Sequence, residues 1–368
     1  MDAGRSSLNG PGINKGFPPG RGKGEQGGVF LNNRSLSLTV FVTFLLAVLI
    51  IGYIGNALET KKNEPELQPF PHVDTSISTR EEQAAETNVT PLKNATRKPK
   101  IWYSHQVVVL MYHHVSEKSK QPYAIKPELF ARHMSFLHEN GFNPITLDEF
   151  TGFLQTGDLS TANAVFITFD DGYESYYTDA FPILRRYGYP SVNFIIADRL
   201  RDGMDRKPEN MTTPLTRQEV AEMAGTGLAA FGSHTYSLHD AEERNEWGEL
   251  GPETAPVFRE DLQRLEVEQE YRDRLYVDFN MSRVGLGEWT GHQVDAISLP
   301  FGYTNTIVRE TARQAGYRFV FTSTPGVVKR GTDPFTIPRY DVGLPSVDET
   351  SLHQLFTKAK NEFEGEQS

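Results

Sequence analysis

The stretch Ala164–Gly172 reads Ala-Val-Phe-Ile-Thr-Phe-Asp-Asp-Gly, and it gives the clearest indication of the fold. Its first six residues are apolar or strand-forming, and the run stops at two carboxylates and a glycine. Such a run, ended by a turn residue, is typical of a buried strand in a parallel sheet. Because α/β folds place their chemistry at the carboxyl ends of strands, Asp170 and Asp171 are candidate functional residues. Burying two unpaired anions is costly, so a metal ion, a proton or a cation should lie close to them.

Strand-like apolar runs alternate with amphipathic segments along most of the remaining chain. Strands are expected at residues 107–112, 191–196, 228–232, 296–299, 319–323 and 337–342. Helices are expected at residues 127–140, 147–154, 173–187, 216–224, 305–315 and 352–363, and in part of 253–281. This alternation predicts an α/β fold with a parallel sheet, and the number of strands favours an irregular (β/α) barrel.

The overall composition excludes some classes of protein and site. The chain has 368 residues, a net charge of -11 and no cysteine. An acidic balance argues against a general nucleic-acid binder, because such proteins need basic residues to neutralise phosphates. The lack of cysteine excludes disulfides, thiolate metal ligands and cysteine nucleophiles.

The N-terminal part of the chain predicts a membrane anchor. Residues 1–35 are rich in Gly, Pro, Ser and Asn and are locally basic, which is typical of a disordered cytoplasmic tail. Residues 36–58 contain no charged side chain, and about 20 uncharged residues can cross the ~30 Å hydrocarbon core as a helix. The alternatives are a buried core helix and a signal peptide cleaved after residues 55–57.

A polar segment separates this anchor from the folded domain. Residues 59–104 are charged and poor in aliphatic side chains, which is typical of a flexible extracytoplasmic stalk. The folded domain is expected at residues 105–368. These features predict a single-pass protein of the cell membrane whose folded domain lies outside the cytoplasm.

Two histidines could bind, together with the aspartate pair, the metal ion that these carboxylates require. His234 and His239 follow the strand expected at 228–232 and are five residues apart. Taken alone, such histidines are more often ordinary loop residues, and Asp-Asp-Gly alone is more often a turn and helix N-cap. Together at neighbouring strand ends they favour a zinc-like site, in which three protein ligands leave a position for water. Adjacent strand residues point to opposite faces, so one aspartate can bind the metal while the other acts as a base.

Three motifs of the chain resemble the first three motifs of the polysaccharide deacetylases (NodB-like, carbohydrate esterase family four). They are Thr-Phe-Asp-Asp-Gly at 168–172, His234-Thr235 with His239, and Pro300-Phe301-Gly302. The opening Met-Tyr-His-His-Val at 111–115 and the histidine spacing are more similar to one branch, the poly-β-1,6-N-acetylglucosamine deacetylases of biofilm systems. The resemblance covers about residues 105–345 and implies a (β/α) barrel of the NodB-homology type.

The resemblance also implies roles for individual residues. Matched by position, the metal ligands are Asp171, His234 and His239. Asp170 would be the general base and His113 the general acid of a metal-assisted amide hydrolysis. The implied cofactor is a divalent metal ion; zinc is expected, with cobalt, nickel and iron as alternatives for a site of two histidines and one aspartate.

The third motif would contribute the remaining contacts with substrate. The backbone N–H of Phe301 would help to hold the oxyanion, and Pro300 and Tyr303 would lie beside the substrate. Aromatic side chains that could stack on sugar rings, with packing in the core or on the surface as the alternative, are Tyr173, Tyr176, Trp289 and Tyr303.

The sequence departs from the family pattern in several places. The arginine that usually precedes the third motif is missing, because Ser298 and Leu299 stand there. We hypothesise that Arg339, on the strand expected at 337–342, replaces it beside Asp170. No Leu-x-His motif closes the domain, and His353 is interpreted as structural.

Two further points concern the first histidine motif and the second loop. His114 could be the acid in place of His113, although adjacent strand residues diverge and only one should enter the site. About forty residues, 240–280, separate the second and third motifs.

The expected function is removal of N-acetyl groups from N-acetylglucosamine in a cell-surface or biofilm polysaccharide, with release of acetate. Peptidoglycan and chitin oligosaccharides are alternative substrates. A catalytically weak module that binds exopolysaccharide and a glycoside hydrolase with two carboxylates are alternatives of other classes. The expected partners are the polysaccharide and, through residues 36–58, the membrane.

Overall fold

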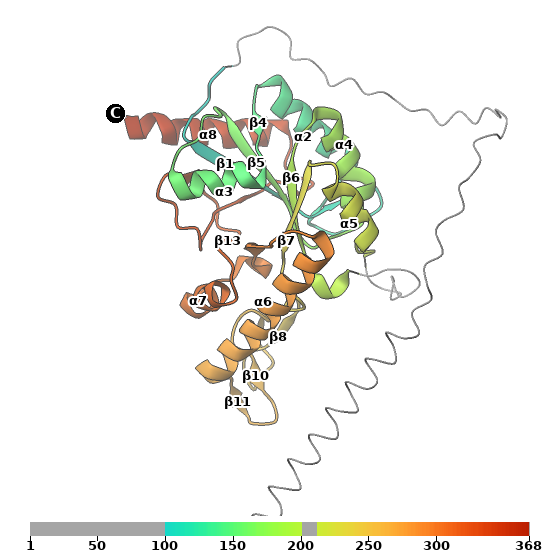
Figure 1. Ribbon diagram of the computed structural model, residues 1–368, viewed down its shortest axis with the longest axis vertical. Helices are drawn as coiled ribbons and strands as arrows, with labels where there is room; N and C mark the ends of the chain where they lie inside the picture. Colours follow the sequence, from blue (N-terminus) through green and yellow to red (C-terminus); the bar gives the residue numbers. More distant parts are fainter. Residues whose placement is uncertain (1–99, 201–211, 368) are drawn as a thin grey trace, which may run out of the picture. The chain divides into compact units, whose positions relative to one another are not determined.

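The computed structural model describes residues 100–200 and 212–367 (Figure 1). The expected tail and membrane anchor, and all of the expected stalk up to residue 99, lie outside the described residues. Within the two described ranges, none of the helices combines the length and the apolar character that a membrane crossing requires.

A parallel sheet forms the centre of the described part. Its strands lie in the order β13-β12-β7-β6-β5-β1, and each neighbouring pair is parallel. They are β1 (Gln106–Tyr112), β5 (Ala164–Phe169), β6 (Ser191–Ile195), β7 (Ala229–Ser233), β12 (Ala296–Ser298) and β13 (Phe319–Phe321). Two short strands extend the sheet: β4 (Asn143–Pro144), which pairs with β5, and β14 (Val328–Lys329), which pairs antiparallel with β1. The strands expected before residue 330 are therefore confirmed, each within about two residues of its predicted bounds.

The segment from Ile337 to Asp341 contacts both edges of this sheet. Ile337 forms a parallel bridge with Phe321 of β13, and β15 (Tyr340–Asp341) pairs in parallel with β1. The sheet therefore curves until one segment touches its first and last strands, as in an irregular (β/α) barrel. The predicted strand at 337–342 is interrupted, because Arg339 between the two pairings donates its backbone N–H to Thr324 instead.

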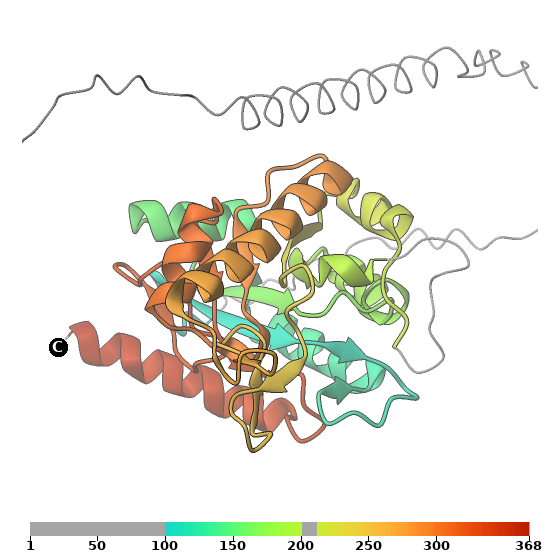
Figure 2. The same cartoon turned by 90° about the horizontal axis from the view of Figure 1, so that it is seen from below.

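Helices cover the sheet, and Figure 2 shows strands lying between α8 and α6. The helices are α2 (Pro127–Glu139), α3 (Leu147–Thr156), α4 (Phe181–Tyr187), α5 (Arg217–Ala224), α6 (Glu268–Thr290), α7 (Thr306–Gln314) and α8 (Glu349–Gln367). Thr146 and Thr216 begin α3 and α5 with capping boxes. In each box the threonine side chain accepts the backbone N–H of the glutamate three residues later, and that glutamate side chain accepts the backbone N–H of the threonine. The capping box read from the sequence at Thr216 is confirmed.

The alternation of side chains along the strands separates two apolar clusters. On β1, Val108 and Leu110 belong to the larger cluster, which includes side chains from α2, α4, α5, α6, α7 and α8. Val107 and Val109 point the other way and join a smaller cluster with Phe166 and the phenylalanines of α3. A strand buried on both faces explains the uninterrupted apolar runs in the sequence.

The structure corrects two sequence-based boundaries. The helix expected at 173–187 consists of a π-helical turn, Tyr176–Ala180, followed by α4. Trp102 and Tyr103, assigned to the end of the stalk, are buried in the larger cluster, so the domain begins before residue 105. The sequence did not indicate this earlier start, because two adjacent aromatic residues within a polar segment form no helical or strand pattern.

The stretch between the second and third motifs also differs from expectation. Helix α6 begins only at Glu268 and continues to Thr290, beyond the expected end at 281. Before it come two hairpins, β8 (Ala241–Glu243) with β9 (Leu250–Pro252), and β10 (Phe258–Arg259) with β11 (Arg264–Leu265). Figure 1 shows these hairpins and the start of α6 at one end of the domain. The remaining short strands, β2 (His114–Val115) and β3 (Ala124–Ile125), pair with each other.

Candidate active site

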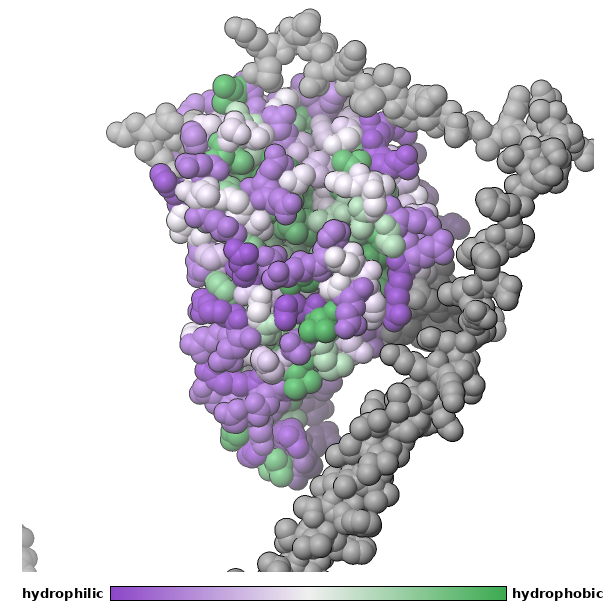
Figure 3. Space-filling model, in the orientation of Figure 1, coloured by the Kyte–Doolittle hydropathy of each residue, from purple (hydrophilic) through white to green (hydrophobic). Residues whose placement is uncertain are grey.

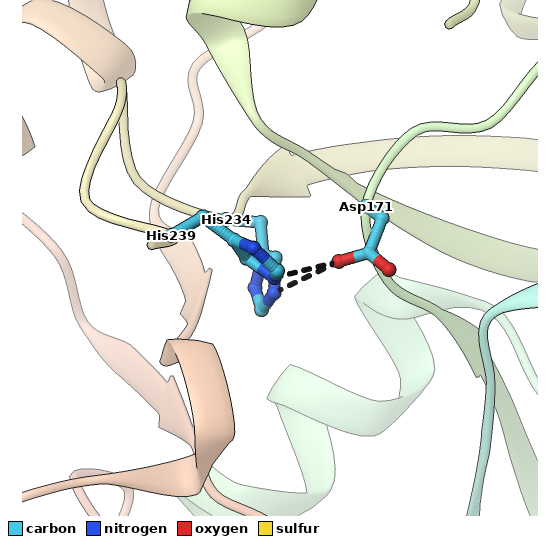
Figure 4. Close-up of side chains that lie close together, drawn as sticks. All are labelled: Asp171, His234 and His239. Carbon is cyan, nitrogen blue, oxygen red and sulfur yellow. Dashed lines mark ion pairs between the residues drawn. The ribbon is translucent and has the colours of Figure 1, made fainter. Parts of the chain in front are cut away.

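Asp171, His234 and His239 come together at the carboxyl ends of β5 and β7 (Figure 4). Asp171 Oδ1 lies 3.3 Å from Nε2 of His234 and 3.0 Å from Nε2 of His239. One ligand atom from each residue lies within 4.8 Å of the others. Both imidazoles thus turn the same nitrogen toward one carboxylate oxygen, as the sequence predicted for a shared ion.

The chemistry of this triangle fits a divalent metal ion. Asp171 Oδ1 is buried and has no hydrogen-bond partner among the described residues. His234 Nδ1 lies 2.8 Å from the carbonyl oxygen of Ser298, which fixes the proton on Nδ1 and leaves Nε2 free to bind a metal. Burial alone would raise the pKa of Asp171, but the two imidazoles hold it well below its usual range. The carboxylate is therefore ionised and available as a ligand.

Strained backbone conformations occur in all three motifs. Asp171, Thr235 and Phe301 have φ angles of 79°, 71° and 56°, in the left-handed region that residues with a Cβ avoid. Each such residue costs about 1–3 kcal/mol, and such residues cluster at functional sites. Gly172, at φ 72°, continues the turn after β5, where a Cβ would lie 3.0 Å from the Ile195 side chain. The motif glycine is thus required for the close approach of β5 and β6.

The loop that joins the two histidines is held by Asp278 on α6. Its carboxylate accepts hydrogen bonds from the backbone N–H groups of Tyr236 and Ser237, both at 2.8 Å. Asp278 is 7% exposed, and burial raises its pKa to about 6. Sequence reasoning missed this residue, because nothing in the local pattern of α6 shows which loop its buried carboxylate meets.

Asp170, the neighbour of Asp171, has a different partner. Arg339 donates to both of its oxygens, with Nη1 2.8 Å from Oδ1 and Nη2 2.7 Å from Oδ2. Ser298 Oγ donates to Oδ2 at 3.0 Å, and Thr168 Oγ1 lies 3.3 Å from Arg339 Nη1. Arg339 is 1% exposed. The contact hypothesised from the sequence between Arg339 and Asp170 is therefore present, and Ser298, at the position of the missing arginine, supports it.

The surroundings of Asp170 keep it ionised. Burial opposes the charged form, but the Arg339 guanidinium, with a smaller contribution from His234, lowers the pKa of Asp170 from 3.8 to about 2. Sequence position alone did not place Arg339 here, since 169 residues separate it from Asp170. The register of β15 on β1 brings the two together.

His113 and His114 diverge as expected for adjacent residues. His114 is buried, with Nδ1 2.6 Å from Ser175 Oγ and its ring against Tyr173. The ring of His113 lies near Tyr123, and its charge, when present, lowers the pKa values of both motif aspartates. His114 therefore has a structural role, in contact with Ser175 and Tyr173, whereas His113 remains the candidate acid near the aspartate pair.

The third motif forms a turn next to His239. Phe301 lies in the short helical turn Pro300–Gly302, and its ring centroid is 5.4 Å from that of His239. Pro300 is buried, whereas Phe301 is 61% exposed. Tyr303 is half-buried and its hydroxyl oxygen lies 3.4 Å from Asn305 Nδ2. The expected oxyanion-binding residue therefore lies at the edge of the metal triangle.

Most of the aromatic candidates for sugar stacking have structural surroundings. Tyr176 is fully buried and its hydroxyl lies 2.8 Å from Ser191 Oγ, so of the two alternatives given for it, packing in the core is the one that the structure shows. Trp289 packs against the core and under the guanidinium of Arg217. Burial raises the pKa of Tyr173, and the nearby Asp171 charge raises it further, so its hydroxyl stays protonated beside the site. His353, read as structural, lies edge-on against Trp102.

Comparison with known proteins supports the resemblance. The family model described as "Polysaccharide deacetylase" matches residues 159–320. A poly-β-1,6-N-acetyl-D-glucosamine N-deacetylase of Escherichia coli is 26% identical over 274 residues, covering 71% of this chain and 40% of the relative. The enzyme of that name from Staphylococcus aureus is 25% identical over 231 residues, covering 62% of this chain and 71% of the relative.

Two solved structures share the fold at similar identity. A de-N-acetylase from Aggregatibacter actinomycetemcomitans is 26% identical, with a TM-score of 0.60, and the match covers 68% of this chain and 99% of that one. The deacetylase domain of BpsB from Bordetella bronchiseptica is 25% identical, with a TM-score of 0.58, and the match covers 65% and 96% of the two chains.

The region matched by the family model contains all three motifs and the strands that carry them. The chain spans less than half of the length of the Escherichia coli relative. The named relatives are N-deacetylases, which are hydrolases of carbon–nitrogen bonds. Motifs, fold and relatives agree: residues 159–320 match the polysaccharide deacetylase family, and the described domain is similar in sequence and fold to the named N-deacetylases.

Proposed function

We propose that this protein is a metal-dependent N-deacetylase that releases acetate from N-acetylglucosamine units of a polysaccharide. The observation that carries the proposal is the separation of two adjacent carboxylates. Asp171 faces two imidazole nitrogens, whereas Asp170 faces a guanidinium. Amide hydrolysis at a metal centre needs both environments, one to hold an ion and one to keep a base ionised.

The side chains then divide the reaction between them. Asp171, His234 and His239 would hold a divalent metal ion, with zinc as the expected species, and the bound ion would supply Lewis-acid polarisation of the acetamide carbonyl and of a water molecule. Asp170 takes the proton of the attacking water, and His113 gives a proton to the leaving amine. The backbone N–H of Phe301 donates to the oxyanion.

The substrate class is inferred from the relatives, whose names specify poly-β-1,6-N-acetyl-D-glucosamine. We propose a polymer of this type, as found at cell surfaces and in biofilms, as the substrate. The uncharged stretch at residues 36–58 supports the further proposal that the protein is anchored in the cell membrane with its catalytic domain outside the cytoplasm.

Acetate release from β-1,6- and β-1,4-linked N-acetylglucosamine oligomers tests this function. The expected result is release from the 1,6-linked oligomers, loss of release with a chelator, and recovery on adding Zn²⁺. Faster release from 1,4-linked oligomers would assign a chitin or peptidoglycan substrate instead. Chain shortening without acetate would indicate a glycoside hydrolase, and binding of the oligomers without acetate release would indicate a binding module.

A further inference from the structure

The β8–β9 hairpin begins directly after the second metal-ligating histidine. Asp240 follows His239 in the sequence, and its backbone N–H donates to Glu253 Oε2 at 2.8 Å. The Glu253 N–H in turn donates to the Asp240 carbonyl at 3.1 Å. These two bonds close the base of the hairpin, so its position is fixed relative to the loop that carries His239.

The tip of this hairpin holds a tryptophan in solvent. Asn245 Oδ1 accepts the backbone N–H groups of Trp247 and Glu249, each at 3.1 Å, and Asn245 Nδ2 donates to Glu249 at 2.8 Å. Trp247 is 82% exposed, the highest value among the large hydrophobic side chains of the described residues. A tip that is ordered by its own side chains and presents an indole to water has the form of a binding platform.

The charge of the hairpin limits what this platform can bind. Residues 240–253 contain six acidic side chains and one basic side chain. Asp240 pairs with Arg199 at 3.3 Å, whereas Glu242, Glu243 and Glu246 have no ion-pair partner in the part of the chain that the structure describes. Figure 3 shows this end of the domain as mainly hydrophilic, with isolated hydrophobic residues. An indole beside unpaired carboxylates suits a ligand with an apolar ring face and a positive charge.

We propose that the β8–β9 hairpin is a distal binding site for amine-bearing stretches of a β-linked glucosamine polymer. Trp247 stacks on a sugar ring, and the unpaired glutamates face the ammonium groups. The inference rests on the proposed function, because removal of N-acetyl groups creates those ammonium groups on the polymer. Three paired positions at about 3.3 Å per residue place the tip roughly 10 Å from the hairpin base, so the site binds units away from the one being deacetylated.

The test compares polymer binding and polymer turnover in Trp247→Ala, Trp247→Phe and Leu262→Ala. Leu262 is a matched control, because it is an exposed apolar side chain (46%) at the tip of the neighbouring β10–β11 hairpin. The full chain is titrated calorimetrically with a β-1,6-linked glucosamine hexamer and with the N-acetylglucosamine hexamer. Acetate release is measured from a partially deacetylated polymer and from the N-acetylglucosamine dimer.

We expect Trp247→Ala to weaken binding of the glucosamine hexamer by about 5- to 20-fold and to lower the polymer-to-dimer activity ratio by a similar factor. Trp247→Phe should recover most of both effects, and Leu262→Ala should match the parent chain. Binding should weaken in 0.5 M salt, because the glutamates are exposed. Equal binding by Trp247→Ala and the parent chain, or equal binding of the charged and acetylated hexamers, would overturn the inference. If no acetate is released from either substrate, the proposed function fails, while the binding titrations still decide the hairpin's role.

Discussion

Asp170 and Asp171 are neighbours in sequence, yet they lie in two different electrostatic regions. The metal side consists of Asp171, His234 and His239, whose ligand atoms converge without a satisfactory hydrogen bond at Asp171 Oδ1. The base side consists of Asp170, Arg339 and Ser298, where both carboxylate oxygens have charged or polar donors. One step along the backbone, with Asp171 in the left-handed region, turns two identical side chains toward different partners.

The two aspartates are therefore stabilised in their charged form by different partners. Asp171 faces two imidazoles and is proposed to bind a divalent cation with them, whereas the charge on Asp170 is balanced internally by Arg339. Removal of a ligand on the metal side should therefore lower the metal content. Removal of the partner of Asp170 on the base side should lower the stability and change the pH dependence of activity.

Replacement of a metal-side ligand should have the largest effect. Asp171→Ala removes the only carboxylate of the triangle, so we expect metal content below a tenth of the parent value. Loss of several kcal/mol of charge stabilisation should lower acetate release by about 10³-fold or more. Elemental analysis and acetate release measure both. Asp261→Ala, at an exposed surface carboxylate, is the matched control, and a variant at Asp171 that keeps one ion per chain would contradict the assignment.

The same experiment on the base side should separate metal binding from activity. Asp170→Asn keeps the shape of the side chain and removes its charge, so bound metal should remain. Loss of a general base should lower kcat by about 10²- to 10⁴-fold. Metal loss as large as that of Asp171→Ala would place Asp170 on the metal side.

Arg339→Gln should lower the free energy of unfolding and shift the pH dependence of activity. Breaking a buried ion pair costs about 3–5 kcal/mol, because it leaves Asp170 uncompensated. In the parent chain the lowered pKa of Asp170, about 2, contributes stability that is present above pH ~4 and lost as pH falls toward 2. In the variant burial raises that pKa, so the acid limb of kcat/KM should move to higher pH.

Denaturant unfolding and a kcat/KM profile against pH measure these effects. Arg259→Gln is the control, since Arg259 pairs with Asp261 at the surface and such pairs contribute about 0–1 kcal/mol. An unchanged acid limb in Arg339→Gln would show that Arg339 does not set the ionisation of Asp170.

Asp278→Asn should give the smallest effect, acting on the metal side through the loop. The amide keeps one acceptor for the loop N–H groups, so metal affinity should fall about 10-fold, within the range for residues that orient ligands. Burial raises the pKa of Asp278 to about 6. Below pH ~4 the carboxyl is neutral in both the folded and the unfolded chain, so its burial does not change the pH dependence of stability. As pH rises through 6 the buried group must ionise, which lowers the free energy of unfolding by up to about 3 kcal/mol. The Tm of the variant relative to the parent should therefore increase between pH 4 and pH 7. A constant difference across this range would contradict the burial of a charged carboxylate at this position.

The sequence predicted the elements best where local pattern decides structure. The apolar run before Asp170 was predicted to be a buried strand and forms β5, and the capping box at Thr216 begins a helix where expected. The hairpins before α6 were missed, because their strands are two or three residues long and carry no periodicity. The burial of Trp102 and Tyr103 depends on α8, far away in the sequence, as shown by the stacking of Tyr103 on Phe356.

The principal residues of the site could be predicted from local sequence: an aspartate pair at a strand end, two histidines five residues apart and a Pro-Phe-Gly turn. These follow from local chemistry, because a short run of residues specifies both a turn and the ligands on it. The side chains that support them become visible only in the folded chain: Arg339 and Ser298 at Asp170, and Asp278 at the histidine loop. Each of these partners lies on a segment far away in the sequence, so its position depends on strand register and helix packing, which no local pattern records.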